Sequence, residues 1–267
     1  MPDLSFQKLV GAGNDFVFIA KEDLDSTVQL SSFAKKICDR RYGVGADGLV
    51  VLQRGSSYDL GWEFYNSDGS LAEMCGNAAR CVVRYAKENL NWDEFQFNTA
   101  IGPVLGKNLT DQETQVSWEL QQLAGVEKSL AIKNFANLKG QLFNTGVPHF
   151  VIDENHFPLN SLDCLDVQEH KDFSPSGVNV TLYSLAKMDP QVSTRSFERG
   201  VRDFTLACGT GVIATALALG AASSKQEMKL VAPGGPLRVQ CLGQRVFLTG
   251  PAISVFKGQI STRDLYV

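Results

Sequence analysis

Two cysteines have neighbours that suit acid–base chemistry. Cys75 and Cys208 are each followed by glycine, and each Cys-Gly pair lies between a polar loop and a segment with helical patterning. A thiol at a helix N-terminus has a lowered pKa, because the free N–H groups and the helix dipole favour the thiolate. We therefore predict that both thiols are ionisable groups at the mouths of helices.

The glycine after each cysteine allows the backbone to approach a ligand closely. The amides of Gly76 and Asn77 could then hold a carboxylate at the start of the first helix. Gly209 and Thr210 offer the same arrangement at the second helix. The two motifs together predict an anionic ligand that carries a carboxylate.

Two acid–base groups on opposite sides of one carbon suit inversion at a stereocentre. One thiolate would remove an α-proton while the opposite thiol delivers another, and no cofactor is needed. Amide dipoles on the α-carboxylate would stabilise the negative charge that develops. His149 and Glu198 are the titratable residues nearest these motifs and could tune the thiols. Alternatively, His149 is a hydrogen-bonded core residue and Glu198 a surface charge.

The two cysteines are about half of the chain length apart, which predicts two similar half-domains that face each other across a cleft. We place the first half-domain at residues 1–122, completed by 252–267, and the second at 123–251. The segment Gln121–Leu138 is polar and lacks strand alternation, so it is the predicted crossing between them.

The elements that must position the cysteines can be read from periodicity. Helical spacing predicts helices over 31–41, 78–87 and 212–222, and the last is apolar all round, so it must be covered on every side. Alternation predicts strands through most of the rest, with few helices between them, which favours a mostly antiparallel sheet wrapped round each cysteine helix. The glycines of Gly43–Gly48 precede a strand and not a helix, so a dinucleotide-binding loop is excluded.

Bulk composition narrows the class of protein. A net charge of −4 without a basic cluster argues against nucleic-acid binding, and we expect a small-molecule partner. No apolar run reaches the ~20 residues of a membrane span, and no signal pattern opens the chain, so a cytoplasmic protein without membrane attachment is expected. Six cysteines without a CxxC pair, together with three histidines, favour reduced thiols and no metal site.

Nine motifs match one known family over nearly the whole chain. They are Gly13–Phe16, Gly43–Gly48, Asn66–Gly69, Met74–Arg80, Gly146–His149, Val178–Val180, Glu198–Gly200, Ala207–Gly211 and Thr249–Ala252. On these residues the chain resembles the diaminopimelate epimerases, which are cofactor-independent two-cysteine enzymes of lysine and peptidoglycan biosynthesis. The resemblance implies an α/β (α+β type) fold of two pseudo-symmetric domains, each a curled, mostly antiparallel sheet around a central helix, with the active site in the cleft.

The resemblance also implies roles for individual residues. Cys75 and Cys208 correspond to the acid–base pair that interconverts LL- and meso-diaminopimelate, and His149 and Glu198 to the residues that modulate it. The implied substrate side-chain contacts are Asn14, Asn66, Asn179, Glu198 and Arg199. The implied carboxylate cradle is Gly76, Asn77, Gly209 and Thr210. A homodimer is implied as well, without cofactor or metal.

The chain departs from the family pattern at four positions. Val147 stands where many members carry Asn, Phe204 where Glu is common, and Gly48 where some carry Gln. Phe256 replaces a Tyr that is frequent at the dimer contact. The first three departures concern recognition of the distal end of the substrate, and the last concerns assembly.

Three other readings compete with this one. A related racemase would act on another amino acid such as histidine or proline, although the proline racemase group typically has His where this chain has Asn77. A thiol hydrolase could use Cys208, His149 and Asn179 as a triad, but Cys75 would then have no role. A binding module could capture an anion at the helix mouths without any chemistry.

Overall fold

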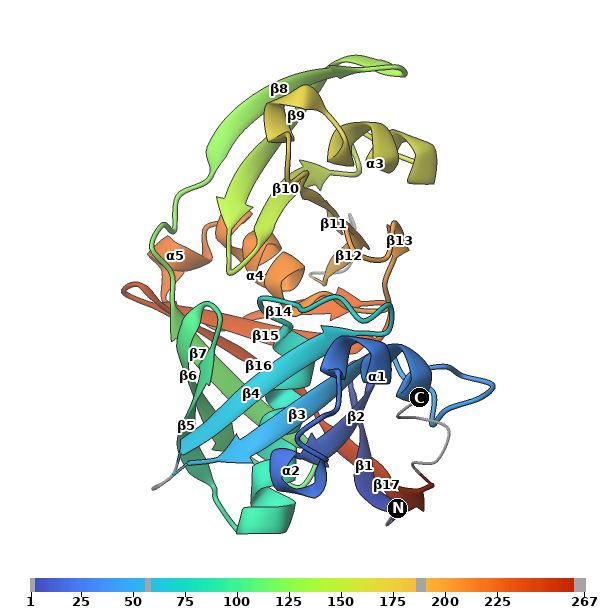
Figure 1. Cartoon of the computed structure of the whole chain (residues 1–267). Coiled ribbons are helices and arrows are strands. Elements are labelled where there is room, and N and C mark those ends of the chain that lie inside the picture. Colours follow the sequence, from blue (N-terminus) through green and yellow to red (C-terminus); the bar gives the residue numbers. More distant parts are fainter. Residues whose placement is uncertain (1–2, 56–58, 186–190, 262–267) are drawn as a thin grey trace. The chain divides into compact units, whose positions relative to one another are not determined.

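The computed structural model describes residues 3–55, 59–185 and 191–261, and the chain divides into two compact units (Figure 1). The first unit comprises Met1–Val116 and Gly250–Val267, and the second comprises Ser117–Thr249. The boundaries expected from the sequence, after residues 122 and 251, both lie slightly later in the chain. Within the described ranges, every helix falls short of the length and apolarity that a membrane span requires.

The first unit is built mainly from strands. Its strands are β1 (Leu4–Gly11), β2 (Asn14–Ala20), β3 (Gly48–Arg54), β4 (Asp59–Asn66), β5 (Glu94–Thr99), β6 (Gly102–Asn108) and β17 (Ile253–Ile260), and its helices are η1 (Lys21–Asp23), α1 (Leu30–Ile37) and α2 (Gly76–Leu90). Strand β1 pairs antiparallel with β17 and β2, β2 parallel with β3, β3 antiparallel with β4, β4 parallel with β5, and β5 antiparallel with β6. Helix α2 is therefore the crossover between the parallel strands β4 and β5.

The second unit repeats this arrangement. Its strands are β8 (Val126–Ile132), β9 (Phe135–Asn144), β10 (Pro148–Asp153), β11 (Asn179–Leu185), β12 (Val192–Glu198), β13 (Asp203–Phe204), β14 (Met228–Ala232) and β15 (Gly235–Leu242), and its helices are α3 (Ser161–Gln168), η2 (Lys171–Phe173), α4 (Gly209–Ala218) and α5 (Ala221–Ser224). Two further strands, β7 (Glu113–Glu119) and β16 (Arg245–Pro251), each contain a boundary between the units. Strand β10 pairs parallel with β11, β11 antiparallel with β12, β12 parallel with β14, and β14 antiparallel with β15.

The order of parallel and antiparallel pairs is the same in both units. The series β2, β3, β4, β5, β6 in the first corresponds to β10, β11, β12, β14, β15 in the second. In each series the connection from the third strand to the fourth contains a helix that a cysteine precedes, α2 in the first unit and α4, followed by the short α5, in the second. The expected α+β fold class with two pseudo-symmetric domains is confirmed.

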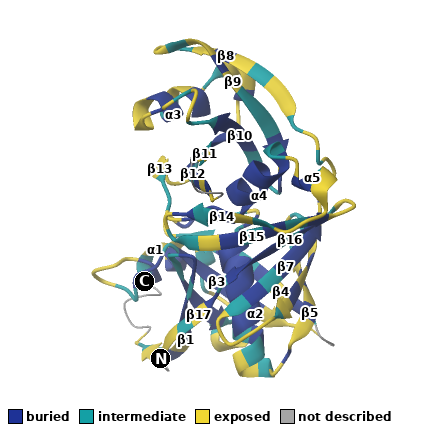
Figure 2. Ribbon diagram, turned by 180° about the vertical axis from the view of Figure 1, so that it is seen from behind, coloured by how far each residue is buried: buried dark blue, intermediate teal, exposed yellow. Residues whose placement is uncertain are grey.

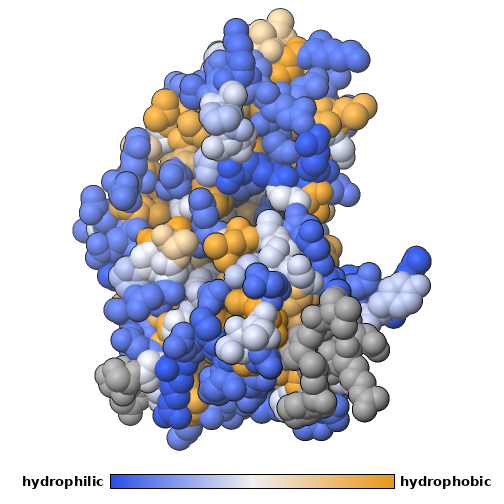
Figure 3. Space-filling view, in the orientation of Figure 1, coloured by the Kyte–Doolittle hydropathy of each residue, from blue (hydrophilic) through white to orange (hydrophobic). Residues whose placement is uncertain are grey.

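Each crossover helix forms the centre of its own unit. Helix α2 packs against β1, β2, β6 and β17, and helix α4 packs against β10, β11, β12, β14 and β15. All residues from Gly209 to Leu217 are buried, as the uniformly apolar sequence of α4 requires (Figure 2). In the space-filling view, hydrophilic residues make up most of the visible surface of both units (Figure 3).

Two expectations from periodicity were wrong, and the helix predicted over 31–41 is shorter, because α1 ends at Ile37. The segment Gln121–Leu138, predicted as a crossing without strands, contains β8 and the start of β9, which pair as a hairpin. Leu130 and Leu138 are nearly its only buried residues, so the hairpin shows little apolar alternation. The predicted helix 212–222 begins earlier and ends at Ala218, because Gly220 adopts a left-handed conformation (φ 87°) that stops it.

Candidate active site

Cys75 occupies the N-cap position of α2. Its backbone is extended (φ −141°, ψ 112°), its carbonyl accepts the first helical hydrogen bond from the Ala79 amide at 2.9 Å, and its Sγ accepts from the Ala78 amide at 3.5 Å. The thiol is half-buried. The helix begins at Gly76, two residues before the predicted start at 78, so the sulfur lies at the positive end of the helix dipole.

Cys208 occupies the same position on α4. Its backbone is also extended (φ −119°, ψ 107°), and its carbonyl accepts from the Val212 amide at 2.9 Å. The residue is only 8% exposed. Its Sγ lies 3.4 Å from Thr210 Oγ1 and 4.0 Å from His149 Nε2. Thr210 therefore contributes a hydroxyl to the thiol, in addition to the backbone amide that the sequence predicts.

His149 is completely buried beside Cys208. Its Nε2 lies 2.9 Å from Thr210 Oγ1, and its Nδ1 lies 2.8 Å from Thr181 Oγ1. Burial, together with the charge of Arg199, lowers the pKa of His149 to about 3. The imidazole is therefore neutral at pH 7, and its contact with the Cys208 sulfur involves no charge on the ring.

Two hydroxyl residues extend this network, and the sequence did not single them out. Thr181 and Ser196 face each other on the antiparallel strands β11 and β12, and their hydroxyl oxygens are 2.9 Å apart. Gly211 allows this packing, because a Cβ there would lie 2.3 Å from Ser196 Oγ and 3.0 Å from Thr181 Oγ1. The hydrogen-bond network around His149 therefore depends on glycine at position 211, which leaves room for the two hydroxyl groups.

The strand ends next to His149 carry three of the predicted substrate contacts. Asn179 is opposite His149 in the parallel register of β10 and β11, and its Oδ1 accepts from the Arg199 amide at 2.9 Å. Glu198 ends β12 and accepts a hydrogen bond from Thr205 Oγ1 at 2.5 Å. The structure thus gathers Asn179, Glu198 and Arg199 at one end of adjacent strands.

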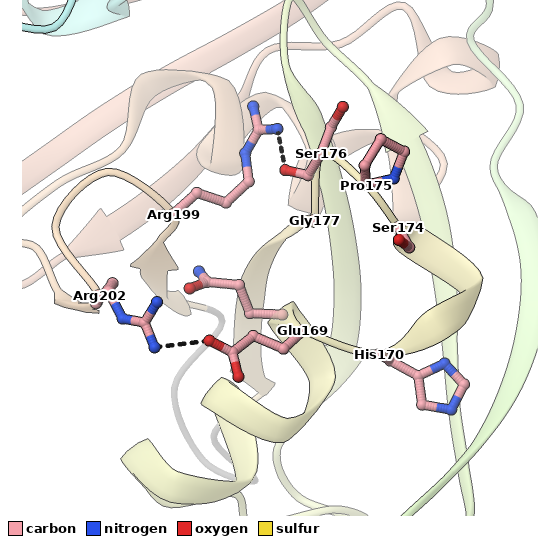
Figure 4. A pocket seen from close by; sticks show the side chains of 9 residues that line it. Glu169, His170, Ser174, Pro175, Ser176, Gly177, Arg199 and Arg202 are labelled. Atoms are coloured by element: carbon pink, nitrogen blue, oxygen red, sulfur yellow. Dashed lines mark hydrogen bonds and ion pairs between the residues drawn. The ribbon is translucent and has the colours of Figure 1, made fainter.

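The Arg199 guanidinium borders a pocket of about 330 Å³ in the second unit (Figure 4). It donates to the carbonyl of Ser176 at 2.8 Å. Arg202 lines the same pocket and pairs with Glu169 at 2.6 Å. Arg199 is held by a neutral carbonyl whereas Arg202 is neutralised by a carboxylate, so Arg199 is the better placed of the two to receive an anion.

The predicted amide contacts of the first unit fall into two groups. Asn77 is buried, and its Nδ2 donates to Asn14 Oδ1 at 2.6 Å, which brings these two residues together. Asn66 ends β4, and its Nδ2 donates to Ser70 Oγ at 2.9 Å within the tight 66–70 turn. The side-chain amide of Asn66 thus donates within its own turn, whereas that of Asn77 donates to Asn14.

Two of the departures from the family pattern have a physical explanation. The Phe204 ring packs edge-on against Phe197 (5.4 Å between centroids), with the Arg195 guanidinium over its face at 4.3 Å. A Cβ at Gly48 would lie 2.5 Å from the Phe64 ring and 2.7 Å from the Tyr65 carbonyl oxygen, so no larger side chain fits there. Both positions serve packing in this chain.

Comparison with known proteins identifies the family. The family model described as diaminopimelate epimerase matches residues 6–120 and 142–255. The diaminopimelate epimerase of Aquifex aeolicus is 35% identical over 284 residues, which cover 98% of this chain and 99% of the relative. That of Hydrogenobaculum sp. is 34% identical over 272 residues, covering 95% and 97%.

A solved structure shows the same fold at lower identity. A hydroxyproline epimerase from Agrobacterium vitis superposes with a TM-score of 0.74 at 16% identity, covering 98% of this chain and 93% of that one. The matched residues of the family model include both cysteine motifs and both crossover helices. The chain therefore belongs to the diaminopimelate epimerase family and is an isomerase.

Proposed function

We propose that this isomerase interconverts LL- and meso-diaminopimelate without a cofactor, by a two-base mechanism in lysine and peptidoglycan biosynthesis. The observation that carries the proposal is the repeated geometry of Cys75 and Cys208, each the N-cap of the crossover helix of its own unit. One thiolate removes the α-proton, and the other thiol returns a proton to the opposite face of the carbon. The Cα–H bond breaks, its electrons delocalise into the α-carboxylate, and a new C–H bond forms with inverted configuration.

The carboxylate is the group that needs stabilisation in this step. Deprotonation at Cα places a second negative charge on it, and amides that point at that charge lower the barrier because they need no reorganisation. Gly76 and Asn77 would supply such amides from α2, and Gly209 and Thr210 from α4. The glycines keep the space in front of the amides free of side chains.

His149 serves this chemistry best as a neutral partner. Because its pKa is lowered to about 3, it does not place a competing charge beside Cys208. Its Nε2 can orient the Thr210 hydroxyl, whose oxygen lies 3.4 Å from Cys208 Sγ. Glu198 is the remaining modulating residue in the proposal, on the strand next to Asn179.

The hydrolase alternative has less support. A thiol hydrolase triad would need Asn179 to orient the His149 ring. Thr181 takes that place on Nδ1, and the Asn179 side chain accepts from the Arg199 backbone. Neither the binding-module nor the hydrolase alternative explains why the cysteine motif occurs twice.

The direct test is incubation of the purified protein with LL-diaminopimelate in deuterated water. We expect conversion to the meso isomer with one deuteron incorporated at the inverted α-carbon, without added pyridoxal phosphate or metal. Mass spectrometry and chiral chromatography would follow both changes. Binding of diaminopimelate without α-proton exchange would contradict the proposal and favour the binding module.

The proposal includes a homodimer that forms through β17. Ile253, Val255 and Phe256 are 47%, 54% and 48% exposed on this strand, an unusual density of exposed apolar side chains. The Phe256 ring is supported edge-on by Phe6, at 5.8 Å between centroids. We expect Phe256→Glu to give a monomer in light scattering, whereas Leu162→Glu, at an exposed leucine of α3, should not change the molar mass. A monomeric unmodified protein would contradict this assignment.

A further inference from the structure

Arg80 is a buried cation in the interior of α2. It is completely inaccessible to solvent, its Nη1 donates to the Gly76 carbonyl at 3.2 Å, and its Nη2 donates to Asn77 Oδ1 at 2.7 Å. Its Nε is buried without a partner, and no carboxylate of the described residues pairs with the guanidinium. Burial lowers the pKa of Arg80 to about 10, so it remains cationic at neutral pH. An unpaired buried charge opposes folding, so stability does not explain this residue.

A directed chain of hydrogen bonds begins at Arg80. Asn77 Oδ1 accepts from Arg80, and Asn77 Nδ2 donates to Asn14 Oδ1 at 2.6 Å. Asn14 Nδ2 then donates to Asp47 Oδ2 at 2.9 Å. The side-chain amides of Asn77 and Asn14, two residues that the family resemblance implies at the substrate site, thus lie in series between a guanidinium and a carboxylate.

The two ends of this hydrogen-bond chain, Arg80 and Asp47, fix the orientation of both side-chain amides. A guanidinium can only donate, so the side of Asn77 that faces Arg80 must be its oxygen. A carboxylate can only accept, so the side of Asn14 that faces Asp47 must be its nitrogen. The bond between the two amides satisfies both constraints at once. An isolated asparagine could rotate by 180°, whereas these two cannot without breaking the chain.

The Asp47 end is itself held in place. Arg40 Nη2 lies 2.7 Å from Asp47 Oδ1 and also 2.8 Å from Asp15 Oδ1. The Asp47 amide donates to Asp15 Oδ1 at 3.1 Å. Burial disfavours the Asp15 charge, but hydrogen bonds from Arg40 and Lys8 hold the pKa of Asp15 at about 2. Asp15, which accepts from the Asp47 backbone amide, therefore stays ionised over the whole physiological range.

Arg84, one turn further along α2, provides a contrast. It is 3% exposed, but its Nε donates to the Ala252 carbonyl at 3.1 Å and its Nη2 to the Thr110 carbonyl at 2.6 Å. These bonds tie two distant segments of the first unit to the helix. Arg84 is thus a buried arginine with a structural role, and it is not part of the amide chain.

We propose that Arg80 and Asp47 are positioning residues that fix the side-chain amides of Asn77 and Asn14 in the single orientation that the reaction uses. Neither residue needs to touch the substrate. The catalytic part of this inference rests on the proposed epimerase function, whereas the existence of the directed chain does not.

A double-mutant cycle tests the catalytic part. Arg80→Met and Asp47→Asn should each lower kcat/KM for diaminopimelate roughly 10- to 100-fold, as expected when a positioning group is released. Because both act on the same amides, the double variant should lose little more than either single variant. If the losses of kcat/KM in the two single variants multiplied in the double variant, the coupling between Arg80 and Asp47 would be contradicted. Arg80→Lys, which keeps a donor for Asn77, should lose less activity than Arg80→Met.

Stability separates positioning from a structural role. Arg80→Met removes an unpaired buried charge and should leave the melting temperature unchanged or raise it while activity falls. Arg84→Met is the matched control, and it should lower the melting temperature while the folded protein keeps its kcat/KM. A parallel loss of stability and activity in Arg80→Met would overturn the proposal.

The hydrogen-bond chain can also be tested by a measurement that does not depend on turnover. In protein labelled with ¹⁵N-asparagine, the side-chain amide resonances of Asn14 and Asn77 can be assigned from their loss in Asn→Ala variants. Arg80→Met should shift the resonances of Asn14 as well as those of Asn77, although Asn77 is the one of these two residues to which the Arg80 guanidinium donates. If the Asn14 resonances did not shift, the proposed hydrogen-bond chain would be contradicted. If the unmodified protein did not turn over diaminopimelate, the proposed function would be contradicted. The resonance shifts would still test the hydrogen-bond chain.

Discussion

Replacement of either Cys75 or Cys208 by alanine is expected to lower the epimerisation rate of diaminopimelate by at least ~10³-fold, because general acid–base groups contribute about 10²–10⁴-fold each. In the proposed mechanism each thiol serves one face of the α-carbon, so neither can substitute for the other. Cysteine→serine variants should be severely impaired too, since a hydroxyl is a far weaker base at neutral pH. The measurement is conversion of LL- to meso-diaminopimelate under saturating substrate.

Other cysteines of the chain supply the controls. Cys81 lies on α2 and Cys164 on α3, and both are completely buried. Burial raises the pKa of the Cys164 thiol to about 12 and that of Cys81 further still, so neither is a thiolate at neutral pH. Cys81→Ala and Cys164→Ala should therefore reduce stability while the folded enzyme keeps its turnover. Near-normal epimerisation by Cys75→Ala or Cys208→Ala would rule out the two-base mechanism.

The helix-capping cysteines could be predicted from sequence because the signal is local. A polar loop, a Cys-Gly pair and a helical pattern lie within a few residues of one another, and the structure places both cysteines at N-caps. The α4 core helix was equally predictable, because a segment that is apolar on every side has to be enclosed. Its end at Ala218 is set by the left-handed conformation of Gly220, a single residue that a helical hydrophobic pattern does not reveal.

The hydroxyl network around His149 could not be predicted in the same way. Thr181 and Ser196 meet only because β11 and β12 pair in one particular register. A small polar residue on a strand has the same sequence signal whether it faces solvent or a buried histidine. Arg80 was overlooked for a similar reason, since an arginine within a helix usually lies on its exposed face, whereas this one is fully buried. Long-range register decides these cases, and one sequence does not contain it.

We expect Arg199 to bind the distal end of the substrate. Arg199→Lys should therefore lower kcat/KM for diaminopimelate by roughly 10- to 100-fold. A guanidinium presents two parallel donors to a carboxylate, whereas an ammonium is a point charge on a flexible stem. Loss of such a charge-assisted bond costs about 1.5–3 kcal/mol, which corresponds to this range. The lysine keeps the positive charge, so the low pKa that Arg199 helps to impose on His149 should change little.

The control for this substitution lies in the same pocket. Arg202 also lines it, but pairs with Glu169 and is more exposed, so Arg202→Lys should change kcat/KM by less than about twofold, as expected for an exposed ion pair. A mono-amino acid such as histidine has no distal carboxylate, so any weak racemisation of it should be nearly the same in Arg199→Lys and the unmodified protein. The contrast between the two substrates isolates distal recognition from the chemistry at Cα. Comparable kcat/KM values for histidine and diaminopimelate in the unmodified protein would overturn the substrate assignment, and would point to Val147 and Phe204 as residues that reshape the pocket for a different side chain.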